Sequence, residues 1–168
     1  MTDRQNPPAM RPFLPADAPV LAVIFQDSIE ELTADDYSKS QREAWAAAAD
    51  DAAFAGGLAQ GLTLVGTIGG AVVGFASLQG AERLDMLYVH PTAAGQGVGT
   101  MLLDAVEKLA GARGAKKITA EVSDTAEDFF RKRGYQPYRR NTVRRDEEWL
   151  GNTTMEKPLA PPQARDPS

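Results

Sequence analysis

Cysteine is absent from this chain of 168 residues, and histidine occurs only once, at position 90. The lack of cysteine excludes disulfides, thiolate metal sites and a cysteine nucleophile. A single histidine disfavours a histidine-based zinc site and a Ser-His-Asp triad, so we expect no metal. No hydrophobic run has the length of a membrane span, and the first ten residues are polar and contain proline, unlike a secretion signal. These absences predict a cytoplasmic protein that binds no membrane.

Basic residues are fewer than acidic ones, 18 against 23, which gives a formal net charge of −5 at pH 7. An acidic balance argues against nucleic acid as a partner and suits an amine substrate that arrives as a cation. The length predicts one domain, residues 1–158, that is large enough to bury a core, followed by a disordered tail over residues 159–168. The sequence leaves monomer and homodimer open.

The most informative segment is a strand followed by a glycine-rich turn and a helix, over residues 84–109. Residues 84–89 are apolar on both faces and predict a buried strand, which Pro91 ends. Val98, Leu102 and Val106 have the i, i+4 spacing of an amphipathic helix. Because the first helical turn has unpaired N–H groups and glycines let a ligand approach closely, the turn predicts a phosphate site.

Two common phosphate-binding loops do not fit this turn. A dinucleotide fingerprint needs its third glycine three residues after the second, where this chain has Thr100, and it normally follows the first strand of its unit. The Gly-Lys-Ser/Thr of a Walker loop is absent from the chain. The ligand is therefore a phosphate compound of another class.

The remaining pattern predicts the element order β-α-α-β-β-β-α-β-α-β-β. Asp17 begins the first helix, Ser38 or Ser40 caps the second, and Gly56-Gly57 marks a loop. Gly69-Gly70 between two apolar runs is a strong hairpin turn. The other expected elements are strands near 10–14, 62–68, 71–78, 117–122, 135–143 and 152–157, and a helix over 125–133.

Two motifs resemble those of the GCN5-related N-acetyltransferase (GNAT) family. Residues 94–99 are similar to its acyl-coenzyme-A loop, Gln/Arg-x-x-Gly-x-Gly/Ala, with Ala94 in place of the leading Gln/Arg. Residues 126–135 are similar to its second signature, Ala-x-x-x-Tyr-x-x-x-Gly-Phe. Residues 37–46 and 145–155 resemble a YafP-like branch of small bacterial acetyltransferases, so the resemblance covers roughly residues 10–158.

This resemblance implies an α/β (α+β) GNAT fold. Its sheet would be mixed, mostly antiparallel and twisted, with six to seven strands splayed in the middle and about four flanking helices. The implied function is transfer of the acetyl group of acetyl-CoA directly to an amine of a small molecule or peptide. Because Ala94 and Phe130 depart from the family pattern, a non-catalytic acyl-CoA-binding or sensor module of the same fold is the alternative.

The resemblance also implies which residues bind acetyl-CoA. Backbone groups of the strand would hold the pantetheine arm and the thioester, and the loop would hold the pyrophosphate. Ser123 stands where many members have an asparagine that bonds the pantetheine, although it could instead cap a helix. The implied cofactor-binding residues are Leu87, Tyr88, Val89, Gly95, Gln96, Gly97, Val98, Gly99, Thr100, Ser123, Phe130 and Lys132, with Lys132 toward the 3′-phosphate.

Acetyl transfer also needs a proton donor for the thiolate and a base for the amine. The tyrosine that many family members use as the acid is Phe130 here, so another hydroxyl must serve or the thiolate leaves unaided. Tyr88, Tyr135 and Tyr138 are the candidates, and we predict Tyr138 as the catalytic one, since Tyr135 also fits a core position.

Asp85 is the predicted base because the period-two rule places it on the strand face of Leu87 and Val89. The alternative is a structural role, in which Asp85 is a carboxylate at the end of a strand that pairs with an arginine. Weaker candidates are Glu82, the acidic pair Asp35-Asp36, which could attract a cationic amine, and His90.

Aromatic and amide side chains outside the loop are candidates for the acceptor site. The tryptophans also fit a core or cleft-wall role. The predicted substrate-binding residues are Tyr37, Trp45, Trp149 and Asn152.

Overall fold

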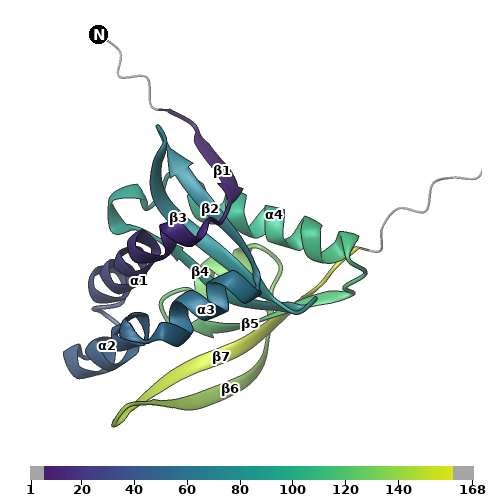
Figure 1. The fold of residues 1–168 in the computed structure, drawn as a ribbon. Helices are drawn as coiled ribbons and strands as arrows, with labels where there is room; N and C mark the ends of the chain where they lie inside the picture. Colours follow the sequence, from purple (N-terminus) through teal and green to yellow (C-terminus); the bar gives the residue numbers. More distant parts are fainter. Residues whose placement is uncertain (1–5, 161–168) are drawn as a thin grey trace, which may run out of the picture.

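A glycine-centred hairpin joins the second and third strands in the seven-stranded sheet of this computed structural model, which describes residues 6–160 (Figure 1). Gly69 and Gly70 both have positive φ values, 59° and 82°, as a two-residue type I′ turn requires. The strand order is β1-β2-β3-β4-β5-β7-β6, and only β4 and β5 pair in parallel. The strands are β1 (Pro8–Pro12), β2 (Leu62–Ile68), β3 (Ala71–Gln79), β4 (Arg83–Val89), β5 (Lys117–Ser123), β6 (Gln136–Arg145) and β7 (Glu148–Pro158).

Five α-helices in the described residues, rather than about four, cover the two faces of the sheet (Figure 1). One core lies between α4, α5 and the sheet and includes Leu102, Val106 and Phe130. The other lies under α1, α2 and α3 and includes Ile24 and Phe75. The helices are α1 (Ala18–Leu32), α2 (Lys39–Ala46), α3 (Ala52–Gln60), α4 (Val98–Ala112) and α5 (Glu127–Lys132).

The additional helix is α3, and the loop expected at Gly56-Gly57 is wrong. Asp51 caps this helix by accepting a hydrogen bond from the N–H of Ala53 at 2.9 Å. Phe54 and Leu58, one turn apart, are both buried against the sheet. Their burial outweighs the helix-propensity cost of the two glycines, about 1 kcal/mol each.

The sheet opens between β4 and β5. The parallel pairing covers only Arg83 opposite Thr119 and Leu84 opposite Ala120. Directly after this pair, the register between β3 and β4 shifts, because Ser77 pairs with Met86 while Leu78 pairs with Leu84. Asp85 is therefore the extra residue of a β-bulge, a feature that bends a strand and re-aims its side chains. The bulge lies at the point where β4 leaves β5.

The chain stays attached to the domain just past its last strand. The N–H of Leu159 donates to the carbonyl of Lys116 at 2.8 Å, and the Leu159 side chain packs against the α4 core. Of the tail expected at 159–168, residues 161–168 lie outside the described residues. No helix between residues 6 and 160 is long and apolar enough to cross a membrane.

Asp17 joins the start of α1 to β1. Both terminal nitrogens of Arg11 donate to its carboxylate at 2.8 Å, as does the N–H of Leu14. The hydrogen bonds from Arg11 lower the pKa of Asp17 to about 2. Because this pKa is lower in the folded than in the unfolded protein, the stabilisation is complete above about pH 4 and is lost as the pH falls toward 2.

We therefore expect Asp17→Asn to lower the free energy of unfolding at pH 7 by about 1 kcal/mol. Urea denaturation of the parent and the variant at pH 7 and near pH 2 measures this loss. The difference between the two proteins should shrink at the lower pH. An equal difference at both pH values would show that the carboxylate charge contributes nothing.

Candidate active site

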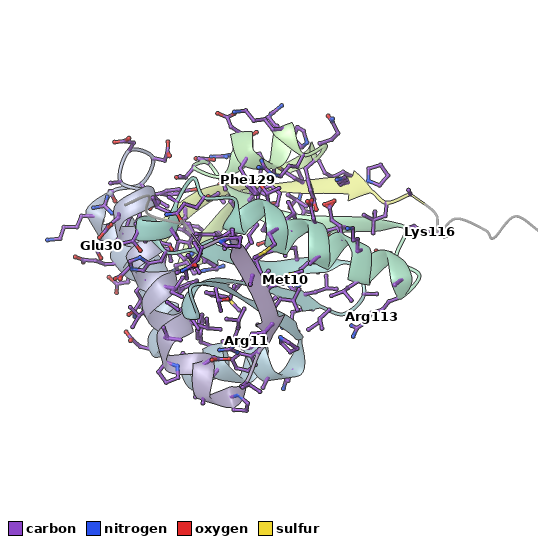
Figure 2. The ribbon with its side chains drawn as sticks, turned by 90° about the horizontal axis from the view of Figure 1, so that it is seen from above. Met10, Arg11, Glu30, Arg113, Lys116 and Phe129 are labelled. Carbon is purple, nitrogen blue, oxygen red and sulfur yellow. The ribbon has the colours of Figure 1, made fainter. Side chains whose placement is uncertain are left out.

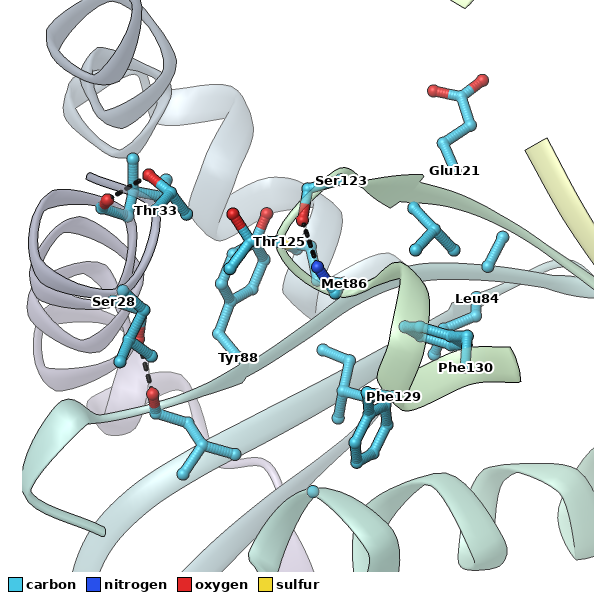
Figure 3. Close-up of a pocket in the computed structure, with 18 of the residues that line it drawn as sticks. Ser28, Thr33, Leu84, Met86, Tyr88, Glu121, Ser123, Thr125, Phe129 and Phe130 are labelled. Atoms are coloured by element: carbon cyan, nitrogen blue, oxygen red, sulfur yellow. Dashed lines mark hydrogen bonds between the residues drawn. The ribbon is translucent and has the colours of Figure 1, made fainter. Parts of the chain in front are cut away.

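A cavity of about 280 Å³ opens where β4 and β5 separate (Figure 3). Side chains from α1, α2, β4, β5 and α5 line it, and most of them are apolar. These apolar residues are Ile29, Leu32, Trp45, Leu84, Met86, Leu87, Val89, Ala120, Val122, Ala126, Phe129 and Phe130. Gly99, in the first turn of α4, also lines this cavity, so it lies beside the glycine turn.

A second, smaller cavity of about 140 Å³ has a polar lining. It lies between α2, β4, β5 and the β6–β7 hairpin. Several residues line this cavity and the apolar one alike, so the two meet at their side chains. The shared residues are Trp45, Asp85, Tyr88, Glu121 and Ser123.

The glycine turn presents unbonded backbone N–H groups at the start of α4. Gly95 and Gly97 have φ values of 78° and 85°, and a Cβ at either position would meet no atom within 4 Å. The first helical hydrogen bond is donated by Met101 to Gly97, so the N–H groups of residues 98–100 have no partner within the described chain. Free N–H groups and the positive end of the helix dipole favour a phosphate at this position.

Gly99 has a different role from Gly95 and Gly97. A Cβ at this position would lie 3.3 Å from the ring of Phe129, so the glycine allows α5 to pack closely on α4. Figure 2 shows Phe129 near the first half of α4, with Arg113 at its far end. Arg133 stacks on Phe129 with its guanidinium carbon 3.6 Å from the ring centre and donates to the Thr100 hydroxyl. Thr100 is thus held by α5 as well as by the loop.

The strand edge of β4 that faces the apolar cavity has no strand partner between Asp85 and Val89 in the described structure. Leu87, Tyr88 and Val89, the residues predicted to hold the thioester, all line this cavity. The carbonyl of Val89 already accepts a hydrogen bond from the Ser28 hydroxyl at 2.7 Å (Figure 3). Backbone binding of a ligand would therefore fall mainly on Leu87 and Tyr88.

The other predicted cofactor residues separate into two groups. Phe130 lines the apolar cavity and is 5% exposed. Ser123 lines both cavities, and its hydroxyl accepts from the N–H of Ala126 at 3.1 Å in the turn that precedes α5, whose N-cap residue is Ala126 and not Ser123. Lys132 is exposed near the end of α5 and lines neither cavity.

The three candidate tyrosines lie in different surroundings. Tyr138 is 68% exposed, sits at a register shift in β6 and lines neither cavity, so its position gives no support to the prediction that it is catalytic. Tyr135 is a buried core residue. Tyr88 lines both cavities (Figure 3), and burial raises the pKa of its hydroxyl, an effect that hydrogen bonding with Trp45 opposes. Tyr88 therefore remains protonated at neutral pH.

Asp85 lies at the junction of the two cavities, with its side chain 32% exposed. It also pairs with Arg83 at 3.3 Å, so the structural alternative expected for this carboxylate is present too. Because of the bulge, Leu84 packs in the same core under α4 as Leu87 and Val89. Side chains in β4 therefore do not strictly alternate between the two faces of the sheet, as the period-two rule assumes.

The weaker base candidates lie elsewhere. Glu82, Asp35 and Asp36 line neither cavity. His90 is also outside both linings, and its ring bonds Asp27 and Thr92, each at 2.8 Å.

Three of the four predicted substrate residues line the polar cavity, namely Tyr37, Trp45 and Asn152. The Tyr37 hydroxyl donates to the carbonyl of Gly151 at 2.6 Å and accepts from the N–H of Asp124 at 3.0 Å. Trp149 is 56% exposed and lines neither cavity, because its side chain lies on the outer side of the β6–β7 hairpin.

Two charged residues of the polar cavity, Glu121 and Arg145, were not predicted from the sequence. Glu121 could have been found from period-two alternation in β5, because Ala120 and Val122 face the core and Glu121 must face the other way. Arg145 reaches the cavity through the long-range pairing of β6 with β7, which no local pattern predicts.

Comparison with known proteins gives a consistent family. Residues 33–159 match the family described as "Acetyltransferase (GNAT) domain". The chain is 30% identical over 146 residues to the uncharacterized N-acetyltransferase YafP of Escherichia coli K12, which covers 87% of this chain and 93% of YafP.

Solved structures show the same fold. A GCN5-related N-acetyltransferase from Rhodopseudomonas palustris superposes with a TM-score of 0.90 and 58% identity, covering 95% of this chain and 100% of that one. PaiA N-acetyltransferase from Thermoplasma acidophilum, in complex with coenzyme A, has a TM-score of 0.74 and 19% identity. The match covers 90% of this chain and 99% of that one. A phosphinothricin acetyltransferase from Sinorhizobium meliloti, in complex with acetyl-CoA, has a TM-score of 0.66 and 18% identity. The match covers 96% of this chain and 93% of that one. The chain therefore belongs to the GCN5-related N-acetyltransferase (GNAT) family and is an acyltransferase.

Proposed function

We propose that this protein transfers the acetyl group of acetyl-CoA directly to an amine of a small molecule or peptide. The observation that carries this proposal is the meeting of an apolar and a polar cavity at Asp85 and Tyr88. A thioester held along β4 in the apolar cavity would present its carbonyl to an amine in the polar one. Such a junction orients the two reactants, which is a large part of acyl-transfer catalysis.

The residues present fit acetyl-CoA. Its pyrophosphate would bind the free N–H groups of residues 98–100, where an anion is favoured. Its pantetheine arm would lie in the apolar cavity against Leu87, Phe129 and Phe130. The Leu87 and Tyr88 backbone, unpaired toward β5, would hydrogen-bond the arm and the thioester carbonyl.

The reaction forms a C–N bond and breaks the C–S bond of the thioester. The ammonium loses one proton to become the nucleophilic amine, and the same nitrogen loses a second proton once the C–N bond has formed. One of these protons leaves through the base, and the other replaces the proton that the donor gives to the departing thiolate. Asp85 is the acceptor that we propose for the first proton, because its carboxylate lies at the junction. Tyr88 takes the place of Tyr138 as the proposed donor, because it lines both cavities and its raised pKa keeps it protonated.

Removal of this hydroxyl should slow the reaction. We expect Tyr88→Phe to lower kcat by roughly 100-fold, the ordinary contribution of a general acid, with little change in acetyl-CoA affinity. Steady-state kinetics and calorimetric titration with acetyl-CoA measure the two quantities. An unchanged kcat would mean that the thiolate leaves without help from Tyr88.

A tyrosine introduced at residue 130 tests whether this residue lies beside the thioester. Phe130→Tyr should preserve or raise kcat in the parent and should restore part of the loss in the Tyr88→Phe protein. A hydroxyl buried there without a partner would instead cost about 1 to 3 kcal/mol of stability. A destabilised and slower Phe130→Tyr protein would contradict a position beside the thioester.

Release of coenzyme A from acetyl-CoA in the presence of a panel of amines tests the proposal itself. We expect release that depends on an amine and exceeds hydrolysis in its absence. Tight binding of acetyl-CoA with no amine-dependent release would favour the alternative, a non-catalytic acyl-CoA-binding or sensor module.

A further inference from the structure

The polar cavity contains charges of both signs at separate positions. Asp85 and Glu121 line it where it meets the apolar cavity, whereas Arg145 lines the polar cavity alone. An acceptor amine must lie at the junction to reach the thioester, so its cation would face the two carboxylates. The far end of the same acceptor would then face Arg145.

Arg145 and Glu121 are not neutralised by neighbours. Within residues 6–160, neither side chain forms an ion pair. Among the described residues, the Arg145 guanidinium donates a single hydrogen bond, to the carbonyl of Arg144 at 3.0 Å. An arginine in a cavity with free donors is suited to a carboxylate, which it can bind through two parallel hydrogen bonds.

Two other polar groups of the cavity already have hydrogen-bond partners. The Tyr37 hydroxyl both donates and accepts, and the Asn152 side-chain oxygen accepts from Asn141 at 3.0 Å. These contacts fix the walls of the cavity and leave ionic recognition to Asp85, Glu121 and Arg145. The cavity volume of about 140 Å³ is smaller than the ~300 to 1,000 Å³ typical of pockets for drug-sized ligands, so the acceptor is compact.

From this arrangement we infer that the acceptor is a compact amine that also carries a carboxylate, as free amino acids do, with the carboxylate on Arg145 and the ammonium facing Asp85 and Glu121. The inference rests on the proposed function and adds the class of acceptor to it. An amine without an anionic group would leave the Arg145 guanidinium without an ionic partner, and an amide in place of the carboxylate would lose the ionic contact.

A matched panel of acceptors tests this class. We expect the parent enzyme to acetylate amino acids with a KM about 10- to 100-fold lower than their primary amides or decarboxylated amines, for example L-leucine against L-leucinamide and isoamylamine. A series of amino acids from glycine to 4-aminobutyrate would vary the distance between the ammonium and the carboxylate of the acceptor. Equal KM values across acids, amides and simple amines would overturn the inference but leave the proposed function intact. No acetylation of any amine would contradict the proposed function itself.

Variants of Arg145 separate recognition from folding. Arg145→Gln should raise the KM for amino acids about 10- to 100-fold while the KM for amides and the acetyl-CoA affinity stay unchanged. Arg145→Lys should recover part of the loss, because it keeps the charge. Arg144→Gln is the matched control, since Arg144 lies next in the same strand but lines neither cavity. An equal KM change in the Arg144 and Arg145 variants, or equal changes for acids and amides, would overturn the inference.

Discussion

Gly97→Asp should weaken acetyl-CoA binding by roughly 100-fold and leave the protein folded. Gly97 is the N-cap of α4 and faces open space, so an added side chain meets the ligand and not the protein. An aspartate there would repel the pyrophosphate, and one such repulsion in a partly solvated site is worth about 3 kcal/mol. Calorimetric titration with acetyl-CoA measures the change.

Two controls isolate the charge from the backbone strain. Gly97→Asn has nearly the same shape, and asparagine tolerates the positive φ of 85° better than most residues. Gly114→Asp places the same charge at a glycine with a φ of 89° and open space, but beyond the opposite end of α4. Acetyl-CoA affinity should be close to that of the parent in Gly114→Asp and only modestly reduced in Gly97→Asn. If Gly97→Asp binds as tightly as these controls, the loop is not the phosphate site.

Asp85→Asn should lower kcat by roughly 10²- to 10⁴-fold, the usual contribution of a general base. Acetyl-CoA affinity should barely change, because the phosphates are held at α4 and not at Asp85. Stopped assays of turnover, together with the acetyl-CoA titration, test both expectations.

Asp85 also forms an ion pair with Arg83, so a loss of activity in Asp85→Asn could come from the loss of this pair and not of a base. Arg83→Gln removes that pair but keeps the carboxylate, and we expect it to change kcat by only a few-fold. If Arg83→Gln is as slow as Asp85→Asn, the carboxylate acts by holding β4 in place. If Asp85→Asn keeps near-normal turnover, the base is a water, Glu82 or the neutral fraction of the amine itself.

Local chemistry allowed most of the helices and strands to be predicted from the sequence, whereas their arrangement in the sheet was implied by the resemblance to the family. The turn at Gly69-Gly70 and the glycine-opened helix that begins at Val98 depend on a few adjacent residues, and both are confirmed. The helix over Gly56-Gly57 was missed because burial of Phe54 and Leu58, a tertiary effect, outweighs local propensity.

The candidate site was harder to predict because it is assembled across the sheet. The loop and strand β4 are contiguous in sequence, so their residues were found together. Arg145 enters through the pairing of β6 with β7, and Tyr138 lies exposed at an irregularity of that pairing. Neither position follows from the spacing of nearby residues, so the charged end of the polar cavity emerged only from the structure.

Transfer of an isotopic label from acetyl-CoA to an amine is the most direct test of this account. Acetyl-CoA labelled in its acetyl group, incubated with the parent enzyme and a panel of amino acids, amides and amines, should give labelled N-acetyl products by mass spectrometry. One coenzyme A should be released for each product, and both should fall together in the Asp85→Asn protein. Acetyl-CoA that binds to the glycine loop but passes no label to any amine would contradict the account.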